Sequence, residues 1–254
     1  MTELSAFFSR IGLPQDTKTE YTPDFLARIQ YAAVLSIPYE NLDILSGTPL
    51  DLAEDALYDK IVLKRRGGYC FELNALLSHM LRRMGFSVRD FLARYLRGEE
   101  EIPFRRHRIA CVTLGNEHYV MDIGVGQVAP RTPLLLKEDL VQTQGEEQYM
   151  LKKNPALGWV VYDLHRDEWR PYIAFTEDTQ YEVDFVPPSF WCEKHPLSPF
   201  NKTPMLAIKT ERGRKTMDGY TYKVFEGNTL VAIEENVTED RYEELVQKEF
   251  GIVL

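Results

Sequence analysis

The sequence lacks the features that mark secreted, membrane-spanning and nucleic-acid-binding proteins. Three of its 254 residues are cysteine and they form no CxxC pair, which argues against a disulfide framework or a cysteine-rich zinc site. No segment approaches the roughly 20 apolar residues of a membrane-spanning helix, and residues 1–16 show no secretory signal pattern. The formal net charge of −9 argues against nucleic acid or acidic membranes as partners. We therefore expect a cytoplasmic protein with reduced cysteines and no metal site.

The first third of the chain has the periodicity of helices. Residues 23–35 begin with a proline and carry apolar residues at helical spacing, and residues 51–64 open on an aspartate suited to cap a helix. After Gly67-Gly68, apolar side chains recur at intervals of three and four residues until Gly85, a typical helix stop. These patterns predict three helices, the last of which starts close to Cys70.

Strand patterns dominate the rest of the chain. Two hairpins are indicated, one turning at Gly115-Asn116 and one between residues 158 and 176. Residues 187–204 contain five prolines and are expected to be irregular. The last part shows strand patterns over residues 205–212, 220–226 and 229–235, and then a closing helix over residues 239–250. We expect a small barrel or curled sheet in the middle of the chain and a mixed α/β lobe at its end.

Cys70 lies in the stretch RGGYCFELN at residues 66–74 and allows two interpretations. It precedes Leu73 by three residues and so continues the apolar stripe of the predicted helix, as a buried structural cysteine would. A nucleophile is the alternative, because the N–H groups at a helix start favour a thiolate. Gly67-Gly68 either allows a substrate to approach closely or only makes a tight turn. The local pattern does not decide between these interpretations.

A cysteine nucleophile usually requires a histidine base and a group that orients it. When the first hairpin turns at its Gly-Asn pair, His107 faces Gly124 and shares one face of the hairpin with Asp122. The two side chains are then diagonal neighbours within reach of each other, whereas a shift of one residue would separate them. His118, beside the turn, is the alternative histidine. Sequence alone does not show that Cys70 meets this hairpin.

Five stretches together carry a resemblance to a known family, and they occur in the family's order. The combination of RGG, an aromatic residue, Cys-x-x-x-Asn, a later histidine and D-x-G-x-G is specific. On these motifs the sequence resembles the arylamine N-acetyltransferases and looks like a bacterial member. The stretches are IPYENLDI at 37–44, RGGYCFELN at 66–74, HRIACVTL at 107–114, DIGVGQVAPRTPL at 122–134 and HPLSPF at 195–200.

The resemblance implies an α+β multi-lobe fold with a papain- or transglutaminase-like Cys-His-Asp core. A helical lobe, residues 1–86, would carry the cysteine. A β-barrel lobe, residues 87–190, would carry the histidine and the aspartate, and an α/β lid would comprise residues 191–254. The resemblance assigns Cys70 as the acetyl-accepting nucleophile, His107 as the base and Asp122 as its orienter.

The implied reaction transfers an acetyl group from acetyl-coenzyme A, a co-substrate, to small aromatic amines or hydrazines by a ping-pong mechanism. No permanently bound cofactor, nucleic acid or membrane is expected. We expect Arg66 to meet Glu40 and Asn41 and to support the Cys70 loop. The candidates for the acceptor pocket are Tyr39, Tyr69, Phe104, Val125 and Gly126, and those for the coenzyme are Arg105, Arg106 and Gly124.

One position departs from the family pattern. Many members carry an aromatic residue where this sequence has Val125, so the preferred amine is open. Two other functions also remain open from the residues. The same Cys-His-Asp geometry could serve a thiol hydrolase or transglutaminase-like enzyme, and the fold could serve as a non-catalytic binding protein.

Overall fold

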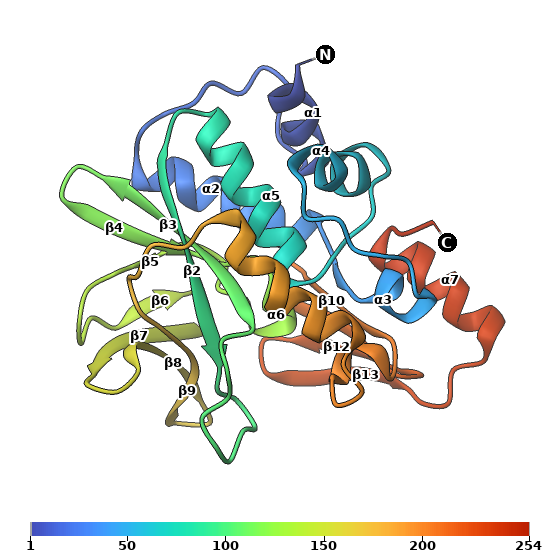
Figure 1. Cartoon of the computed structure of the whole chain (residues 1–254). Coiled ribbons are helices and arrows are strands. Elements are labelled where there is room, and N and C mark those ends of the chain that lie inside the picture. Colours follow the sequence, from blue (N-terminus) through green and yellow to red (C-terminus); the bar gives the residue numbers. More distant parts are fainter. Residues whose placement is uncertain (1, 254) are drawn as a thin grey trace.

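Helices make up most of the first third of the chain, and α5 lies at the centre of the molecule (Figure 1). The computed structural model describes residues 2–253. The apolar positions predicted along α5 are buried almost throughout, and the helix packs against strands β2 and β3. The helical elements here are α1 (Glu3–Arg10), α2 (Pro23–Ser36), α3 (Leu42–Ser46), α4 (Glu54–Leu57), the π-helical turn η1 (Tyr58–Leu63) and α5 (Cys70–Arg83).

The predicted helix over residues 51–64 is wrong in its start and its regularity. Asp51 does not cap it, since its carboxylate accepts a hydrogen bond from the N–H of Ala53 at 2.9 Å in a local turn, and α4 begins at Glu54. The chain then widens into the π-helical turn η1. Lys60, in this turn, lies 2.7 Å from the Asp43 carboxylate. By contrast, the predicted starts of α2 at Pro23 and of a helix close to Cys70 are confirmed.

The middle of the chain forms an eight-stranded antiparallel sheet with the order β5-β4-β3-β2-β9-β8-β7-β6. The side chain of Gln142, on edge strand β6, exchanges two hydrogen bonds with the backbone of Leu135 on the other edge strand, β5. The curled sheet expected here is therefore nearly closed on itself. Its strands are β2 (Ser87–Tyr95), β3 (His107–Leu114), β4 (Glu117–Met121), β5 (Leu134–Leu135), β6 (Gln142–Gln144), β7 (Glu147–Asn154), β8 (Gly158–His165) and β9 (Glu168–Phe175).

The end of the chain forms a second sheet, which includes a strand from the helical part. Strand β1 pairs with β10 through Tyr39 and Ala207, so a strand from the first third of the chain and the strands of its last part form one sheet. The predicted closing helix is confirmed as α7 (Glu239–Phe250), whereas β11 was not predicted. The strands, in sheet order, are β1 (Tyr39–Glu40), β10 (Met205–Lys209), β11 (Gly213–Asp218), β12 (Thr221–Glu226) and β13 (Thr229–Glu234).

The expectation of an irregular segment over residues 187–204 is wrong for residues 187–194, because helix α6 (Glu182–Lys194) runs through Pro187 and Pro188, whereas residues 195–204 are irregular apart from one short helical turn. Asp184 caps the start of this helix by accepting the N–H of Tyr181 at 2.7 Å. Burial of the inward face of α6 stabilises the helix by more than it loses from the hydrogen bonds that its two prolines, which have no N–H, cannot make. The predicted boundary between residues 190 and 191 falls inside α6, and the division into three lobes stays a prediction.

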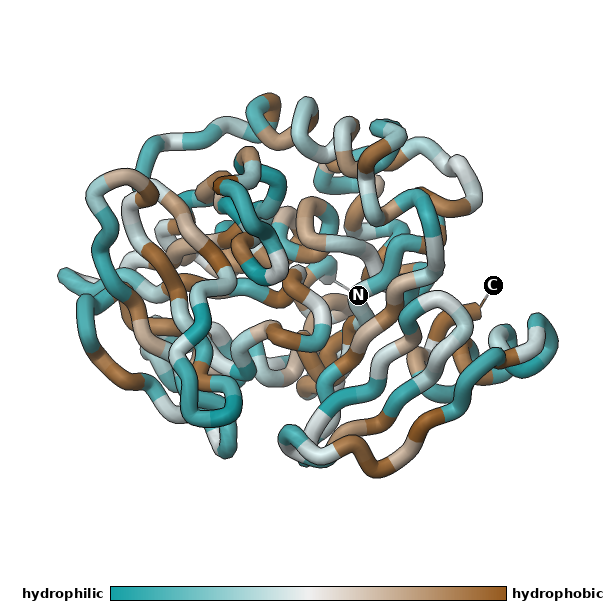
Figure 2. Tube along the Cα trace, turned by 90° about the horizontal axis from the view of Figure 1, so that it is seen from below, coloured by the Kyte–Doolittle hydropathy of each residue, from teal (hydrophilic) through white to brown (hydrophobic). Residues whose placement is uncertain are grey.

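Two short helical turns complete the α+β fold, which is confirmed: η2 (Gly126–Val128) and η3 (Pro199–Asn201). Figure 2 shows hydrophilic residues on the turns at the periphery and apolar residues along the strands and helices between them. Among residues 2–253, no helix combines the length and the hydrophobicity needed to cross a membrane.

Candidate active site

The loop before Cys70 packs tightly against strand β1, and this packing explains why both Gly67 and Gly68 are glycine. A Cβ atom on Gly67 would lie 2.1 Å from the carbonyl oxygen of Pro38, and one on Gly68 would lie 2.9 Å from a carboxylate oxygen of Glu72. The N–H of Glu40 also donates to the carbonyl of Gly68 at 2.9 Å. The glycines therefore allow the backbone to approach β1 and the side chain of Glu72.

The first hairpin has the predicted register. Ala110 pairs with Met121 and Cys111 pairs with Val120, which places His107 and Asp122 on one face just beyond the ladder. Nε2 of His107 lies 2.7 Å from Oδ2 of Asp122, and both side chains are buried. Within residues 2–253, the other ring nitrogen of His107, Nδ1, has no hydrogen-bond partner.

Asn74 holds the carboxylate in place and was missed as a site residue. Its Nδ2 donates to Oδ1 of Asp122 at 2.8 Å and to the carbonyl of Arg108 at 2.6 Å. Its Oδ1 accepts the N–H of Ile123 at 2.9 Å. The spacing of four residues from Cys70 was the available signal, because positions i and i+4 share one face of a helix.

Gly124 brings the hairpin into contact with the start of α5. A Cβ atom at this position would lie 2.7 Å from Cα of Cys70 and 2.8 Å from Nδ2 of Asn74. A glycine is therefore required for this close approach. The contact answers the question that the sequence left open, since the hairpin that carries His107 packs directly on the residue that begins the helix.

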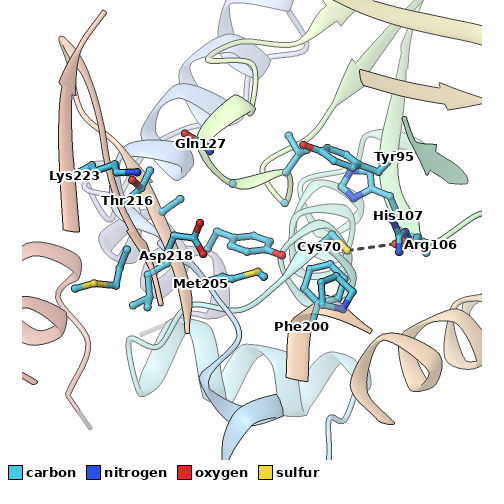
Figure 3. A pocket seen from close by; sticks show the side chains of 18 of the residues that line it. Cys70, Tyr95, Arg106, His107, Gln127, Phe200, Met205, Thr216, Asp218 and Lys223 are labelled. Carbon is cyan, nitrogen blue, oxygen red and sulfur yellow. Dashed lines mark hydrogen bonds between the residues drawn. The ribbon is translucent and has the colours of Figure 1, made fainter. Parts of the chain in front are cut away.

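Cys70 and His107 face a cavity of about 460 Å³ between the two sheets, whereas Asn74 and Asp122 do not line it. Figure 3 shows Cys70, Arg106 and His107 on one side of it and residues of the second sheet, including Lys223, on the other. Five of the predicted pocket and coenzyme residues line the cavity: Tyr39, Arg106, Gly124, Val125 and Gly126. Other residues that line the cavity were not predicted from the sequence, among them Tyr95, Gln127, Phe200, Thr216, Asp218, Lys223 and Phe225.

Three other predicted residues do not line the cavity. Tyr69 is fully buried beneath it, and its hydroxyl bonds to Ser189 on α6. The ring of Phe104 packs edge-on against Trp191, with 4.6 Å between the ring centroids. Arg105 points to the surface, where its guanidinium lies 3.5 Å from Asp178. Proximity in sequence to Cys70 or His107 suggested these residues, but side-chain direction takes them elsewhere.

The predicted partners of Arg66 are half right. Its guanidinium donates to Oε1 of Glu40 at 2.9 Å and to Oδ1 of Asp43 at 2.9 Å. The predicted contact with Asn41 is wrong, because that side chain turns toward the other end of the chain and ties the start of β10 to the helical part. Asn41 bonds to the carbonyls of Phe200 and Thr203 and to the N–H of Met205.

Burial dominates the electrostatics around Cys70. It raises the pKa of the Cys70 thiol well above its ordinary value, and backbone N–H groups of Arg108 and Phe71 oppose this rise only in part. The helix start alone therefore does not acidify the thiol, contrary to the local expectation. Beneath the same loop, burial raises the pKa of Glu72 to about 7, although Nζ of Lys60 lies 2.6 Å from its carboxylate.

Comparison with known proteins shows the class of protein to which the chain belongs. A family model described as N-acetyltransferase matches residues 23–254. An arylamine N-acetyltransferase of Mycobacterium tuberculosis is 35% identical over 223 residues, which cover 85% of this chain and 78% of that protein. These matches define the class of the protein, which is an acyltransferase.

Solved structures extend the match to the whole fold. The arylamine N-acetyltransferase from Salmonella typhimurium superposes with a TM-score of 0.94 at 28% identity and covers 99% of this chain and 92% of its own. That of Mycobacterium marinum in complex with CoA gives 0.91 at 29% identity and covers 98% and 92%. The chain belongs to the arylamine N-acetyltransferase family.

Proposed function

We propose that this protein transfers an acetyl group from acetyl-coenzyme A to the nitrogen of arylamines or arylhydrazines through an acetyl-Cys70 intermediate. The observation that carries the proposal is that Cys70 and His107 line one cavity while His107 bonds to Asp122, and that Gly124 packs directly on Cys70. Family membership supports the two substrates, and a relative with this fold is known in complex with CoA.

The first half-reaction begins with proton transfer within the site. Because burial raises the pKa of the Cys70 thiol, the thiolate forms by passing its proton to Nδ1 of His107 and not by releasing it to water. Asp122, bonded to Nε2, orients the ring and stabilises the imidazolium. The thiolate then attacks the thioester carbonyl, and the coenzyme leaves as its thiol with the proton from His107.

The negative charge of the tetrahedral intermediate requires hydrogen-bond donors. Cys70 is the first residue of α5, so its own N–H has no acceptor within the helix. We assign this N–H to the oxyanion, where it also benefits from the positive end of the helix dipole. Close packing at Gly67 and Gly68 and the bond from Arg66 to Glu40 hold the loop that positions this N–H, and none of these residues lines the cavity.

In the second half-reaction the amine attacks the acetyl group and loses a proton to His107. Aromatic and apolar residues on both walls, among them Tyr39, Tyr95 and Phe200, provide a surface on which an aromatic ring can pack. Val125, which also lines the cavity, leaves more room than an aromatic residue would. Arg106 and Lys223 are the lining cations that could meet the anionic coenzyme, although Glu99, which is ion-paired with Arg106, and Asp218 also line the cavity.

Intact-mass measurement after mixing the protein with acetyl-coenzyme A tests the proposal. We expect one added acetyl group, mapped to Cys70, that disappears when an aromatic amine is supplied. The Cys70→Ser variant should form no thioester and lose about 10³-fold or more in turnover. Hydrolysis of peptides or amides without an adduct would indicate the thiol hydrolase alternative. Neither an adduct nor selective alkylation of Cys70 would indicate a binding protein.

A further inference from the structure

Lys60, in the π-helical turn η1, contacts both ends of the Cys70 loop, which comprises residues 65–69. Its carbonyl accepts the N–H of Arg66 at 3.0 Å, near the start of the loop. Its Nζ donates to Oε1 of Glu72 at 2.6 Å, and Oε2 of the same carboxylate accepts the N–H of Tyr69 at 3.1 Å, at the end of the loop. One residue therefore links the two points between which the chain leaves η1 and enters α5.

The π-helical turn makes the first of these contacts available. In an α-helix the carbonyl of Lys60 would accept the N–H of Lys64, four residues later. Here the N–H of Lys64 donates instead to the carbonyl of Asp59 at 2.8 Å, five residues earlier. The carbonyl of Lys60 is thereby released from the helical pattern and is used by the loop. Single π-helical turns of this kind occur frequently at functional sites.

The side chain of Lys60 is buried among carboxylates and carries a positive charge. Its Nζ also lies 2.7 Å from Oδ2 of Asp43 on α3. Burial disfavours the charged form, but the carboxylates of Glu72 and Glu40 raise the pKa of Lys60 above its ordinary value. Asp43 and Glu40 have a second cation, because both accept hydrogen bonds from Arg66. Within residues 2–253, Glu72 has Lys60 as its one ion-pair partner.

The charge of Glu72 therefore depends on Lys60. Burial raises the pKa of this carboxyl group to about 7, and Lys60 is the strongest influence that opposes the rise. An ionised carboxylate accepts the N–H of Tyr69 about twice as strongly as a neutral group does. A Cβ atom on Gly68 would lie 2.9 Å from Oε2 of Glu72, so the carboxylate is packed directly on the loop. Without the lysine, a protonated carboxyl group would face the backbone that leads into Cys70.

We propose that Lys60 is a positioning residue for Cys70, which through Glu72 holds the backbone at the start of α5 so that the thiol faces the cavity. The inference rests on the proposed role of Cys70 as the acetyl acceptor. Lys60 and Glu72 do not line the cavity, so they act through the backbone and not by contact with a substrate. Their effect should therefore fall on the rate of acetylation and not on the binding of acetyl-coenzyme A.

Rapid mixing with acetyl-coenzyme A, followed by intact-mass measurement, tests the proposal on the full chain. At pH 7, Lys60→Met and Glu72→Gln should each lower the limiting acetylation rate about 10- to 100-fold, and the acetyl-coenzyme A concentration that gives half of this rate should stay within about twofold of the wild-type value. Lys60→Arg should restore most of the rate. The double variant Lys60→Met/Glu72→Gln should be about as slow as either single variant, because both changes weaken the same hydrogen bond.

Lys64→Met is the matched control. The side chain of Lys64 is 68% exposed and pairs with Asp59 at 2.5 Å on the surface, so the same substitution should leave the acetylation rate unchanged. Circular dichroism and thermal melting of each variant show that the rates belong to folded protein. The double variant removes both buried charges together, so it keeps the test available if Lys60→Met alone does not fold.

The alkylation rate of Cys70 with iodoacetamide separates this inference from the proposed function. A wild type that is alkylated selectively at Cys70 but forms no acetyl adduct refutes the proposed function alone. Slower alkylation of Lys60→Met and Glu72→Gln still supports the positioning of Cys70 in that case, and unchanged alkylation overturns it. Wild-type acetylation rates in Lys60→Met, losses that multiply in the double variant, or an equal loss in Lys64→Met also overturn the inference.

Discussion

Replacement of Asn74 tests whether a buried amide maintains the site. The Asn74→Ala variant loses three hydrogen bonds and leaves the carbonyl of Arg108 and the N–H of Ile123 buried without that partner. Asp122 keeps its bond from the N–H of Gly124 at 2.8 Å. At about 1–3 kcal/mol for each of these two unsatisfied buried groups, the free energy of unfolding should fall by about 2–6 kcal/mol.

Activity should fall further than the loss of stability explains. Because the Asn74 amide fixes the carboxylate that orients His107, we expect kcat/KM of the folded variant to drop about 100-fold. The matched control is Ser78→Ala, one turn further along α5. Ser78 bonds a different buried carboxylate, Asp90, at 2.5 Å. That variant should lose stability but retain acetyl transfer.

The near-isosteric Asn74→Asp variant adds a pH dependence. It places a second carboxyl group about where the amide now lies, 2.8 Å from Asp122, and the like charge raises the pKa of the pair. Its protonated form donates a hydrogen bond as the amide does, so activity relative to the wild type should rise as pH falls. Urea unfolding and steady-state kinetics at several pH values measure both effects. An Asn74→Ala enzyme with unchanged kcat/KM would refute the reasoning.

Two further predictions follow from the packing around Cys70. Gly124→Ala should lower kcat/KM about 100-fold, because the added Cβ would lie 2.7 Å from Cα of Cys70 and displace the start of α5. A crystal structure of the variant, or its rate of alkylation at Cys70, would show this displacement. A variant with wild-type rates would contradict the contact. Glu72 has a folded-state pKa of about 7 against an ordinary value of 4.5, so between these pH values the folded state holds a proton that the unfolded state releases. The free energy of unfolding should therefore fall as pH rises from 4.5 to 7, by on the order of 3 kcal/mol in total. Chemical unfolding of Glu72→Gln across this range should show a flatter profile, and an equal slope in both proteins would count against the assignment.

Local patterns were sufficient where one physical rule decides the structure. The apolar periodicity of α5 and the turn at Gly115-Asn116 fix the face of a helix and the register of a hairpin, and both were predicted. The same rules failed at α6. Its prolines have a low helix propensity and indicate an irregular chain, but burial of Phe185 and Cys192 stabilises the helix in spite of them.

The pocket could be predicted only in part. Residues close in sequence to Cys70 and His107 were proposed, and those pointing elsewhere, such as Tyr69 and Arg105, do not line the cavity. Its opposite wall comes from strands about 150 residues further along the chain, where Thr216 and Lys223 are paired neighbours on β11 and β12. No local pattern indicates which distant strand will cover a site.

By itself the sequence determined the residue types and their local geometry: a cysteine at a helix start after RGG, and a histidine and an aspartate on one face of a hairpin. Only the tertiary structure decided that these two elements touch, through the missing side chain of Gly124, and that Asn74 links them. It also decided that burial raises the pKa of Cys70. The physical reason is that contacts between distant segments and the dielectric environment depend on the packing of the whole chain.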